Sequence, residues 1–197
     1  PATKTVLTFL LTVTDTESMT GTDEVEITVV EELGETCTAS GSGDWSDPDT
    51  WSCGHAPGPY DNVVIPAGVT ITLDQDIELG GNLDVQGTFN TNGKTVTLTG
   101  DLEQTLKGNP FLTFDNLVVN KDSRSDTVRI DGRLRVRNRL TIKKGRLRSA
   151  SEYGHVEIQS DGTLELLNDV LVHGDWTNNG LFIVFFLMIR RPPRSTL

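Results

Sequence analysis

The feature that most constrains this chain is a degenerate repeat that runs from residue 62 to residue 184. Short alternating apolar pairs recur there, such as Leu83 with Val85 and Val96 with Leu98. Between the pairs, a glycine is often followed two positions later by an apolar residue, as in Gly81-Asn-Leu83, Gly87-Thr-Phe89, Gly100-Asp-Leu102, Gly132-Arg-Leu134, Gly145-Arg-Leu147, Gly162-Thr-Leu164, Gly174-Asp-Trp176 and Gly180-Leu-Phe182. Glycine permits a tight corner, and the apolar residue after it is expected to point inward.

Short strands between glycine or asparagine corners are typical of a β-solenoid, in which each turn pairs its strand edges with the turns above and below. About five turns of roughly 20 to 25 residues would fit this stretch. Such parallel connections are expected to wind right-handed. The structural alternative is a β-sandwich of antiparallel hairpins, for which Asn92-Gly93 would be a suitable turn.

Two longer alternating segments precede the repeat. Leu7, Phe9, Leu11 and Val13 alternate with mostly polar residues, and so do Val25, Ile27 and Val29. This period of two predicts two half-buried strands joined by a polar turn at residues 15–23. An isolated hairpin is marginally stable in water, so we expect the pair to belong to a larger sandwich.

The runs LTFLLTVTD and TDEVEITVV resemble the last two strands of a PKD-type, immunoglobulin-like domain of bacterial surface proteins. The resemblance covers about 27 residues and lacks the earlier strands of that family. It implies that residues 1–31 are the end of a truncated immunoglobulin-like domain. The small and polar residues 32–43 have the composition of a linker.

The next stretch, DWSDPDTWSCGHAPGPY, places Trp45 and Trp51 six residues apart among Asp, Pro and Gly. One interpretation is an exposed aromatic platform for sugar rings, with calcium held by the aspartates Asp44, Asp47 and Asp49. The favoured interpretation is a cap, in which the two indoles cover the open end of a β-stack and the aspartates cap turns. We therefore expect no cofactor, with calcium retained as the alternative.

Cys37 and Cys53 flank this stretch, and two interpretations stay open: a disulfide formed in an oxidising compartment, or two inert free thiols. A disulfide closing such a loop would contribute roughly 3 kcal/mol. We do not expect a zinc site, because His55 is the only nearby histidine and a structural zinc ion takes four ligands.

The segment CTASGSGDWSDPDTWSCGHAPGPYDNVVIPAGVTITLD resembles the entry to a solenoid module in large extracellular bacterial proteins, including the domain family named for its eight glycines. The stretches GDLEQTLKGNPFLTFDNLVVNK and GDWTNNGLF resemble the parallel β-helix of such proteins. These resemblances, with the glycine steps, favour an all-β chain with a single-stranded right-handed parallel β-helix over residues 44–184. Its location is expected to be extracellular or on a bacterial cell surface.

Charge is distributed unevenly along the chain. It carries 28 acidic and 17 basic residues, which argues against nucleic acid as a partner. Eleven of the basic residues lie between Lys121 and Arg148. Arginine engages carboxylate and sulfate groups with two bonds, so we expect an anionic polysaccharide to be a candidate partner of one face. That face would consist of Arg129, Arg133, Arg135, Arg137, Arg139, Arg146 and Arg148. The alternative is a solvated face paired with acidic residues of adjacent turns, such as Glu103 or Glu157.

No catalytic motif is recognisable, since the three histidines are dispersed and no serine lies in a nucleophile-elbow sequence. We therefore expect a non-catalytic module that serves in structural display, adhesion, glycan contact or contact with other surface proteins. The alternative is an accessory or partial region of a polysaccharide-degrading lyase or hydrolase whose catalytic domain lies elsewhere.

The chain ends in an apolar run, Leu181 to Ile189, followed by two arginines. Nine apolar residues are too few for a membrane span, which needs about 20. The end MIRRPPRSTL resembles a translated sequencing-library adapter, since the DNA word ATG ATA CGG CGA CCA CCG AGA TCT ACA CTC encodes it. We therefore expect residues 185–197 to be non-native, genuine sequence to end near Val184, and the tail not to pack on the solenoid.

Overall fold

The computed structural model describes residues 4–30, 34–149, 151–167 and 170–184. The chain divides into two units, Pro1–Leu33 and Gly34–Leu197, each of which is described by itself. The expectation that residues 185–197 do not pack on the solenoid falls outside the described residues.

The first unit is an antiparallel pair of strands, β1 (Lys4–Thr14) and β2 (Thr20–Val30). The register places Phe9 opposite Val25, and the Asp15 carboxylate accepts hydrogen bonds from the Glu17 and Met19 amides in the connecting turn. Both predicted strands are therefore confirmed. The expected half-burial is not found, because the apolar side chains of Leu7, Phe9, Leu11, Val13, Val25 and Ile27 are exposed.

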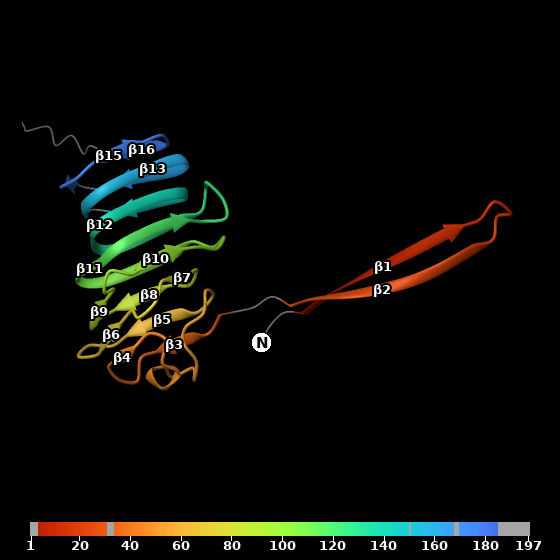
Figure 1. Cartoon of the computed structure of the whole chain (residues 1–197), viewed down its shortest axis with the longest axis horizontal. Helices are drawn as coiled ribbons and strands as arrows, with labels where there is room; N and C mark the ends of the chain where they lie inside the picture. The colour runs from red at the N-terminus through yellow and green to blue at the C-terminus, as the bar shows by residue number, and fades with distance from the viewer. Residues whose placement is uncertain (1–3, 31–33, 150, 168–169, 185–197) are drawn as a thin grey trace, which may run out of the picture. The chain divides into compact units, whose positions relative to one another are not determined.

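The second unit is a β-solenoid of about six parallel turns, seen as a stack in Figure 1. One row of stacked strands consists of β3 (Thr36–Thr38), β5 (Asn62–Ile65) and β8 (Leu83–Val85), a second of β4 (Gly43–Asp44), β6 (Thr70–Thr72) and β9 (Thr88–Asn90), and a third of β7 (Ile77–Leu79) and β10 (Thr95–Leu98). The short 3-10 helix η1 (Pro48–Thr50) lies in the first turn. The alternative sandwich of antiparallel hairpins is wrong for this unit, since every listed strand pair within it is parallel.

Three long strands carry the later turns. They are β11 (Gln104–Asn120), β12 (Thr127–Ser149) and β13 (Ser151–Leu166), and their pairing shifts register where they bend, for example between Val136 and Arg139. The short strands β14 (Leu171–Val172), β15 (Trp176–Asn178) and β16 (Leu181–Val184) pair with β13. Each long strand thus covers more than one side of the solenoid.

The interior consists of apolar ladders that run along the stack. One ladder joins residues that lie in register on consecutive turns and are fully buried, namely Leu79, Leu98, Val119, Ile142 and Ile158. Burying one such side chain stabilises the fold by roughly 1.5–3 kcal/mol. Period-two alternation therefore served as a reliable guide to which side chains face the core.

The turns differ in length, and later turns are shorter than the sequence suggested. The partners Cys37, Val63, Leu83, Leu106 and Ile130 are 26, 20, 23 and 24 residues apart, whereas Leu147, Leu164 and Phe182 are 17 and 18 apart. Because short turns use fewer residues, about six turns fit where about five were expected.

Two local expectations need correction. Residues 32–43 were expected to be a linker, but Thr36–Thr38 pairs with β5 and Cys37 is fully buried, so this part belongs to the first turn. The step Gly100-Asp-Leu102 does not return to the core, since Leu102 is 73% exposed. In both places the linear pattern of residue types is overruled by the path of the chain around the solenoid.

The Asn92-Gly93 pair adopts positive φ at both residues, +48° and +75°. This backbone is what a two-residue hairpin turn requires. The flanking strands do not pair with each other, however, because β9 pairs with β6 whereas β10 pairs with β7 and β11. The same local geometry therefore forms a corner of the solenoid instead of a hairpin.

Replacing Leu117 by alanine should destabilise the solenoid by about 2–5 kcal/mol, because the side chain is fully buried between Val96 and Leu140 of adjacent turns. Leu102→Ala is the matched control and should change the free energy of unfolding by less than about 0.5 kcal/mol. Urea denaturation of both variants measures the difference. Equal effects would contradict the placement of the core.

Candidate functional site

The first turn of the solenoid is filled by two tryptophans. Trp45 and Trp51 are 1% and 3% exposed, and their rings meet edge to face with centroids 5.1 Å apart. The Trp51 indole N–H donates to the Trp45 carbonyl oxygen over 2.9 Å. Trp45 also contacts Phe89, at 5.8 Å between ring centroids. This burial is what the cap interpretation requires, and it leaves neither ring exposed as a platform for a sugar.

The aspartates of this stretch serve the local backbone. The Asp47 carboxylate accepts from the Asp49 amide and caps η1, whose following residue Thr50 is buried. Asp44 lies in β4. Among the described residues, a single group of three or more metal-ligating side chains has its ligand atoms together, and it contains none of the aspartates Asp44, Asp47 and Asp49.

A disulfide joins Cys37 of β3 to Cys53, which follows η1, so the free-thiol interpretation is wrong. The bond crosses the first turn, with 5.1 Å between the two Cα atoms. Cys37 is fully buried in the core, and Cys53 packs against it from a partly exposed position. The disulfide therefore fixes the tryptophan-containing loop to the first strand of the solenoid.

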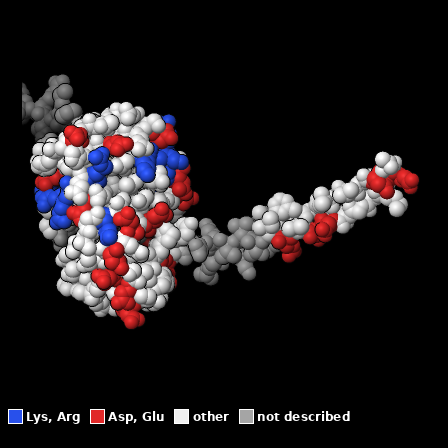
Figure 2. All heavy atoms as spheres, viewed as in Figure 1, with Lys and Arg blue, Asp and Glu red and all other residues white. Residues whose placement is uncertain are grey.

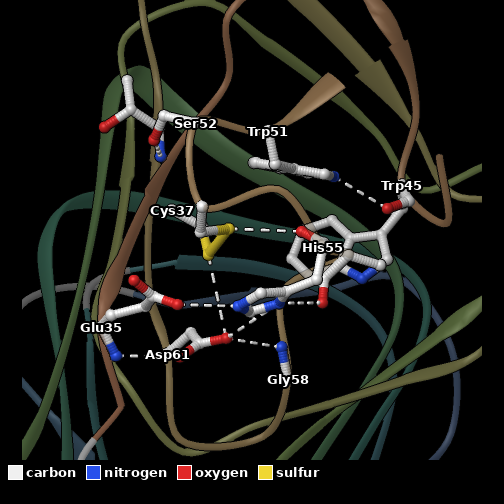
Figure 3. Close-up of a disulfide and its surroundings, with 11 residues drawn as sticks. Glu35, Cys37, Trp45, Trp51, Ser52, His55, Gly58 and Asp61 are labelled. Atoms are coloured by element: carbon white, nitrogen blue, oxygen red, sulfur yellow. Dashed lines mark hydrogen bonds and ion pairs between the residues drawn. A yellow bond between two sulfur atoms is a disulfide. The ribbon is translucent and has the colours of Figure 1, made fainter. Parts of the chain in front are cut away.

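A polar cluster surrounds this disulfide (Figure 3). Asp61 is buried, and its carboxylate accepts hydrogen bonds from the backbone amides of Glu35 and Gly58 at 2.9 and 2.8 Å. Its Oδ2 atom also lies 3.8 Å from Cys37 Sγ. Asp61 thus joins the segment before β3 to the loop before β5. Sequence analysis missed this residue, because its partners are 24 and 26 residues away.

His55 lies beside the same cluster, with Nε2 2.8 Å from Glu35 Oε1 and Nδ1 2.9 Å from the Ala56 carbonyl oxygen. Nδ1 is also 3.8 Å from Asp61 Oδ2. The hydrogen bond to the Ala56 carbonyl and that to Glu35 raise the pKa of His55 above its usual value. The other two histidines lie apart from this cluster: His155 contacts Asp175, at 3.2 Å, and His173 is exposed in the turn after β14.

The basic stretch was expected to be one extended strand with its arginines on one face. Alternation holds from Arg133 to Val136, but Arg137, Asn138 and Arg139 are consecutively exposed, and the register shifts there. The strand bends at this point, because the chain must turn a corner of the solenoid. Arg139 therefore lies beyond a corner from Arg133 and Arg135, and the proposed face is not a single row.

Most arginines of the proposed face pair with carboxylates, many of them on adjacent turns. The pairs are Arg129 with Glu103, Arg135 with Glu152, Arg137 with Asp115, Arg139 with Glu157, and both Arg146 and Arg148 with Glu165. On the side shown in Figure 2, basic and acidic atoms are interleaved over the later turns. Much of the positive charge is thus neutralised within the solenoid.

Arg133 and Lys143 differ, since neither forms an ion pair with any described residue. The Arg133 guanidinium instead lies over the Phe111 ring, 5.4 Å from its centroid, and Arg135 lies over the same ring at 4.8 Å. Both Arg133 and Lys143 are exposed. They are the positions of the basic stretch that remain accessible to an external anion.

Lys121, the first basic residue of this stretch, is buried instead of facing solvent. Its ammonium group donates to the Thr99 carbonyl of the preceding turn. Burial lowers the pKa of Lys121, although the nearby carboxylates of Asp126, Asp122 and Asp101 act in the opposite direction. This lysine is therefore part of the connection between turns.

A shallow groove of about 550 Å³ lies along β8, β11 and β12. Its lining includes Asp84, Asp131, Gln86 and Lys107, and Lys107 Nζ is 3.7 Å from Asp84 Oδ2. Sequence analysis did not single out these residues, because they come from three different turns. The groove brings two carboxylates and two hydrogen-bonding side chains to one polar surface.

Comparisons with protein-family models, with curated proteins and with solved structures find no match for this chain. The described residues include no helix with the length and hydrophobicity of a membrane span. The class that the fold defines is a β-solenoid with a disulfide in its first turn.

Asp115→Asn should lower stability by about 1–2 kcal/mol at neutral pH. Burial alone would raise the pKa of Asp115, but hydrogen bonds from the Gly93 amide, Thr91 and Arg137 lower it on balance. A carboxyl group with a depressed folded-state pKa stabilises the protein above its unfolded value, and this stabilisation is lost as the pH falls through the folded value. The difference between wild type and variant should therefore shrink below about pH 4. Urea unfolding at pH 7 and pH 3 tests this, and a pH-independent difference would contradict it.

Proposed function

We propose that this chain is a non-catalytic structural module of a secreted or cell-surface bacterial protein, where it serves in display and adhesion. The supporting observation is the solenoid with its first turn closed by a disulfide. The apolar ladders are continuous through the turns, and most outward arginines are engaged in ion pairs, many of them between turns. A disulfide of this kind persists in an oxidising compartment, which supports an extracellular location.

The display function predicts that an exported solenoid stays folded among extracellular proteases. A peptide tag fused after residue 184, on a chain exported to a bacterial cell surface, should remain detectable by antibody after protease treatment. Cys37→Ser with Cys53→Ser removes roughly 3 kcal/mol of stabilisation and should reduce the surviving tag. Ser52→Ala with Gly54→Ala, which leave the disulfide in place, do not provide a clean comparison, because Gly54 has positive φ; Leu102→Ala is the better control. Equal survival of the disulfide-free and control proteins would count against a disulfide-stabilised display module.

A second function, binding of an anionic polysaccharide, is favoured by the exposed positions that lack an ion pair. Arg133 presents its guanidinium beside Phe111, and Lys143 adds a second exposed cation in the same strand. The paired arginines contribute less, because an incoming anion must compete with the carboxylate that each already contacts. This narrows the seven arginines expected from the sequence to Arg133, with Lys143 as an addition.

Arg133→Ser should lower the salt concentration that elutes the protein from an immobilised sulfated polysaccharide, since retention depends on an unneutralised charge. Arg129→Ser is the matched control, because it removes the same charge from an arginine that is paired with Glu103. The control should shift elution less. Absence of salt-sensitive retention in the wild type, or equal shifts in both variants, would rule out binding centred on Arg133.

The alternative function is that of an accessory or partial region of a polysaccharide-degrading enzyme. The groove with Asp84 and Asp131 is the observation in its favour, because carboxylates and hydrogen-bonding side chains are suited to sugar hydroxyls. The same polysaccharides distinguish the two functions. Incubation should yield no new reducing ends or unsaturated uronates if the module is non-catalytic, and accumulation of either product would favour the enzyme.

A further inference from the structure

The disulfide and its polar surroundings hold four metal-ligand types at one place. Cys37, Cys53 and His55 place their ligand atoms within 4.8 Å of one another. Asp61 Oδ2 lies 3.8 Å from Cys37 Sγ and 3.8 Å from His55 Nδ1 (Figure 3). The sequence supplied three ligands and no zinc site was expected on that basis. The fold adds the fourth, because Asp61 comes from the loop that leads into the second turn.

These separations match those of a small tetrahedral site. Zinc lies about 2.3 Å from thiolate sulfur and about 2.0–2.2 Å from histidine nitrogen or carboxylate oxygen, which places neighbouring ligand atoms about 3.3–3.8 Å apart. The Asp61 contacts to Cys37 and His55 are at the upper end of this range. In the disulfide the two sulfurs are bonded to each other, so the site forms only after that bond is cut.

The second layer of contacts already orients two of the ligands. The Glu35 carboxylate accepts from His55 Nε2, which leaves Nδ1 as the nitrogen that faces Asp61. A carboxylate on the far nitrogen is the usual support of a zinc-bound histidine. The Asp61 carboxylate is held by the Glu35 and Gly58 amides, and Oδ2 retains a lone pair for a metal ion. His55 would exchange its bond to the Ala56 carbonyl for the metal.

We infer that this cluster is a redox-controlled zinc site, closed as a disulfide under oxidising conditions and able to bind one Zn²⁺ through Cys37, Cys53, His55 and Asp61 once reduced. A dithiol reductant supplies two electrons and two protons, becoming a disulfide itself while the protein disulfide becomes two thiols. Zn²⁺ then replaces the two thiol protons, which are released to solvent. This inference is independent of the display function, since it concerns the state of the first turn and not the outer surface.

The test uses Co²⁺ and Zn²⁺ as probes on the full chain without an affinity tag. Protein is reduced with a dithiol, freed of reductant under anaerobic conditions and titrated with Co²⁺. The reduced protein should develop a thiolate-to-cobalt charge-transfer band that saturates at one ion per chain and is abolished by one equivalent of Zn²⁺. The oxidised protein should develop none. Reduced protein that gains no such band would overturn the inference.

Two variants separate a built site from adventitious thiol binding. His55→Gln removes one ligand from an exposed side chain and should weaken Zn²⁺ binding about tenfold or more. His173→Gln removes an exposed histidine from another turn and should leave binding unchanged. Equal binding by wild type and His55→Gln would overturn the site as described.

A thermal measurement covers the case in which reduction loosens the first turn. Zn²⁺ should raise the melting temperature of the reduced protein, because an ion that binds the folded state alone stabilises that state. It should leave the melting temperature of the oxidised protein unchanged. A reduced protein that zinc does not stabilise would contradict the inference even if some metal is retained.

Discussion

The solenoid depends on hydrogen bonds between consecutive turns. A short strand such as Leu83–Val85 satisfies its backbone groups only through its neighbours, here β5 before it and β11 after it. The same pairing brings inward side chains into register, so each turn buries apolar surface against the next. A turn on its own has neither backbone partners nor a core. Stability therefore comes from the stack, and the first turn needs a different means of closing its outer side.

The first turn provides that closure with side chains instead of another turn. Trp45 and Trp51 fill the space inside it, and the disulfide holds their loop to β3. The spacing from Cys37 to its partner Val63 is 26 residues, longer than any later interval named above. The extra residues carry η1 and the polar cluster around Asp61. Departure from the regular repeat is thus what allows this turn to gather chemically reactive side chains.

Parallel stacking also governs the outer surface. Residues in register on adjacent turns lie about 4.8 Å apart, so a like charge on the next turn would be repelled and an opposite one attracted. Arg135 lies in register with Glu152, and Arg148 with Glu165. The basic stretch is therefore compatible with the stack because carboxylates of neighbouring turns face it. Exposed pairs each contribute little, but they reduce repulsion along the row.

The sequence predicted the parts of this structure that depend on local pattern. Alternation in Val96-Thr97-Leu98 identified a strand and its buried side, and the tryptophan-rich loop was correctly interpreted as a structural element of the first turn. What depends on register was out of reach, because turns of 17 to 26 residues give no fixed offset from which partners can be counted. Asp61 illustrates this limit, since it reaches Cys37 across 24 residues and looks in the sequence like an ordinary turn aspartate. In a solenoid with uneven turns, the side chains that combine into a site are set by turn length, so the sites are found where turn length is most irregular.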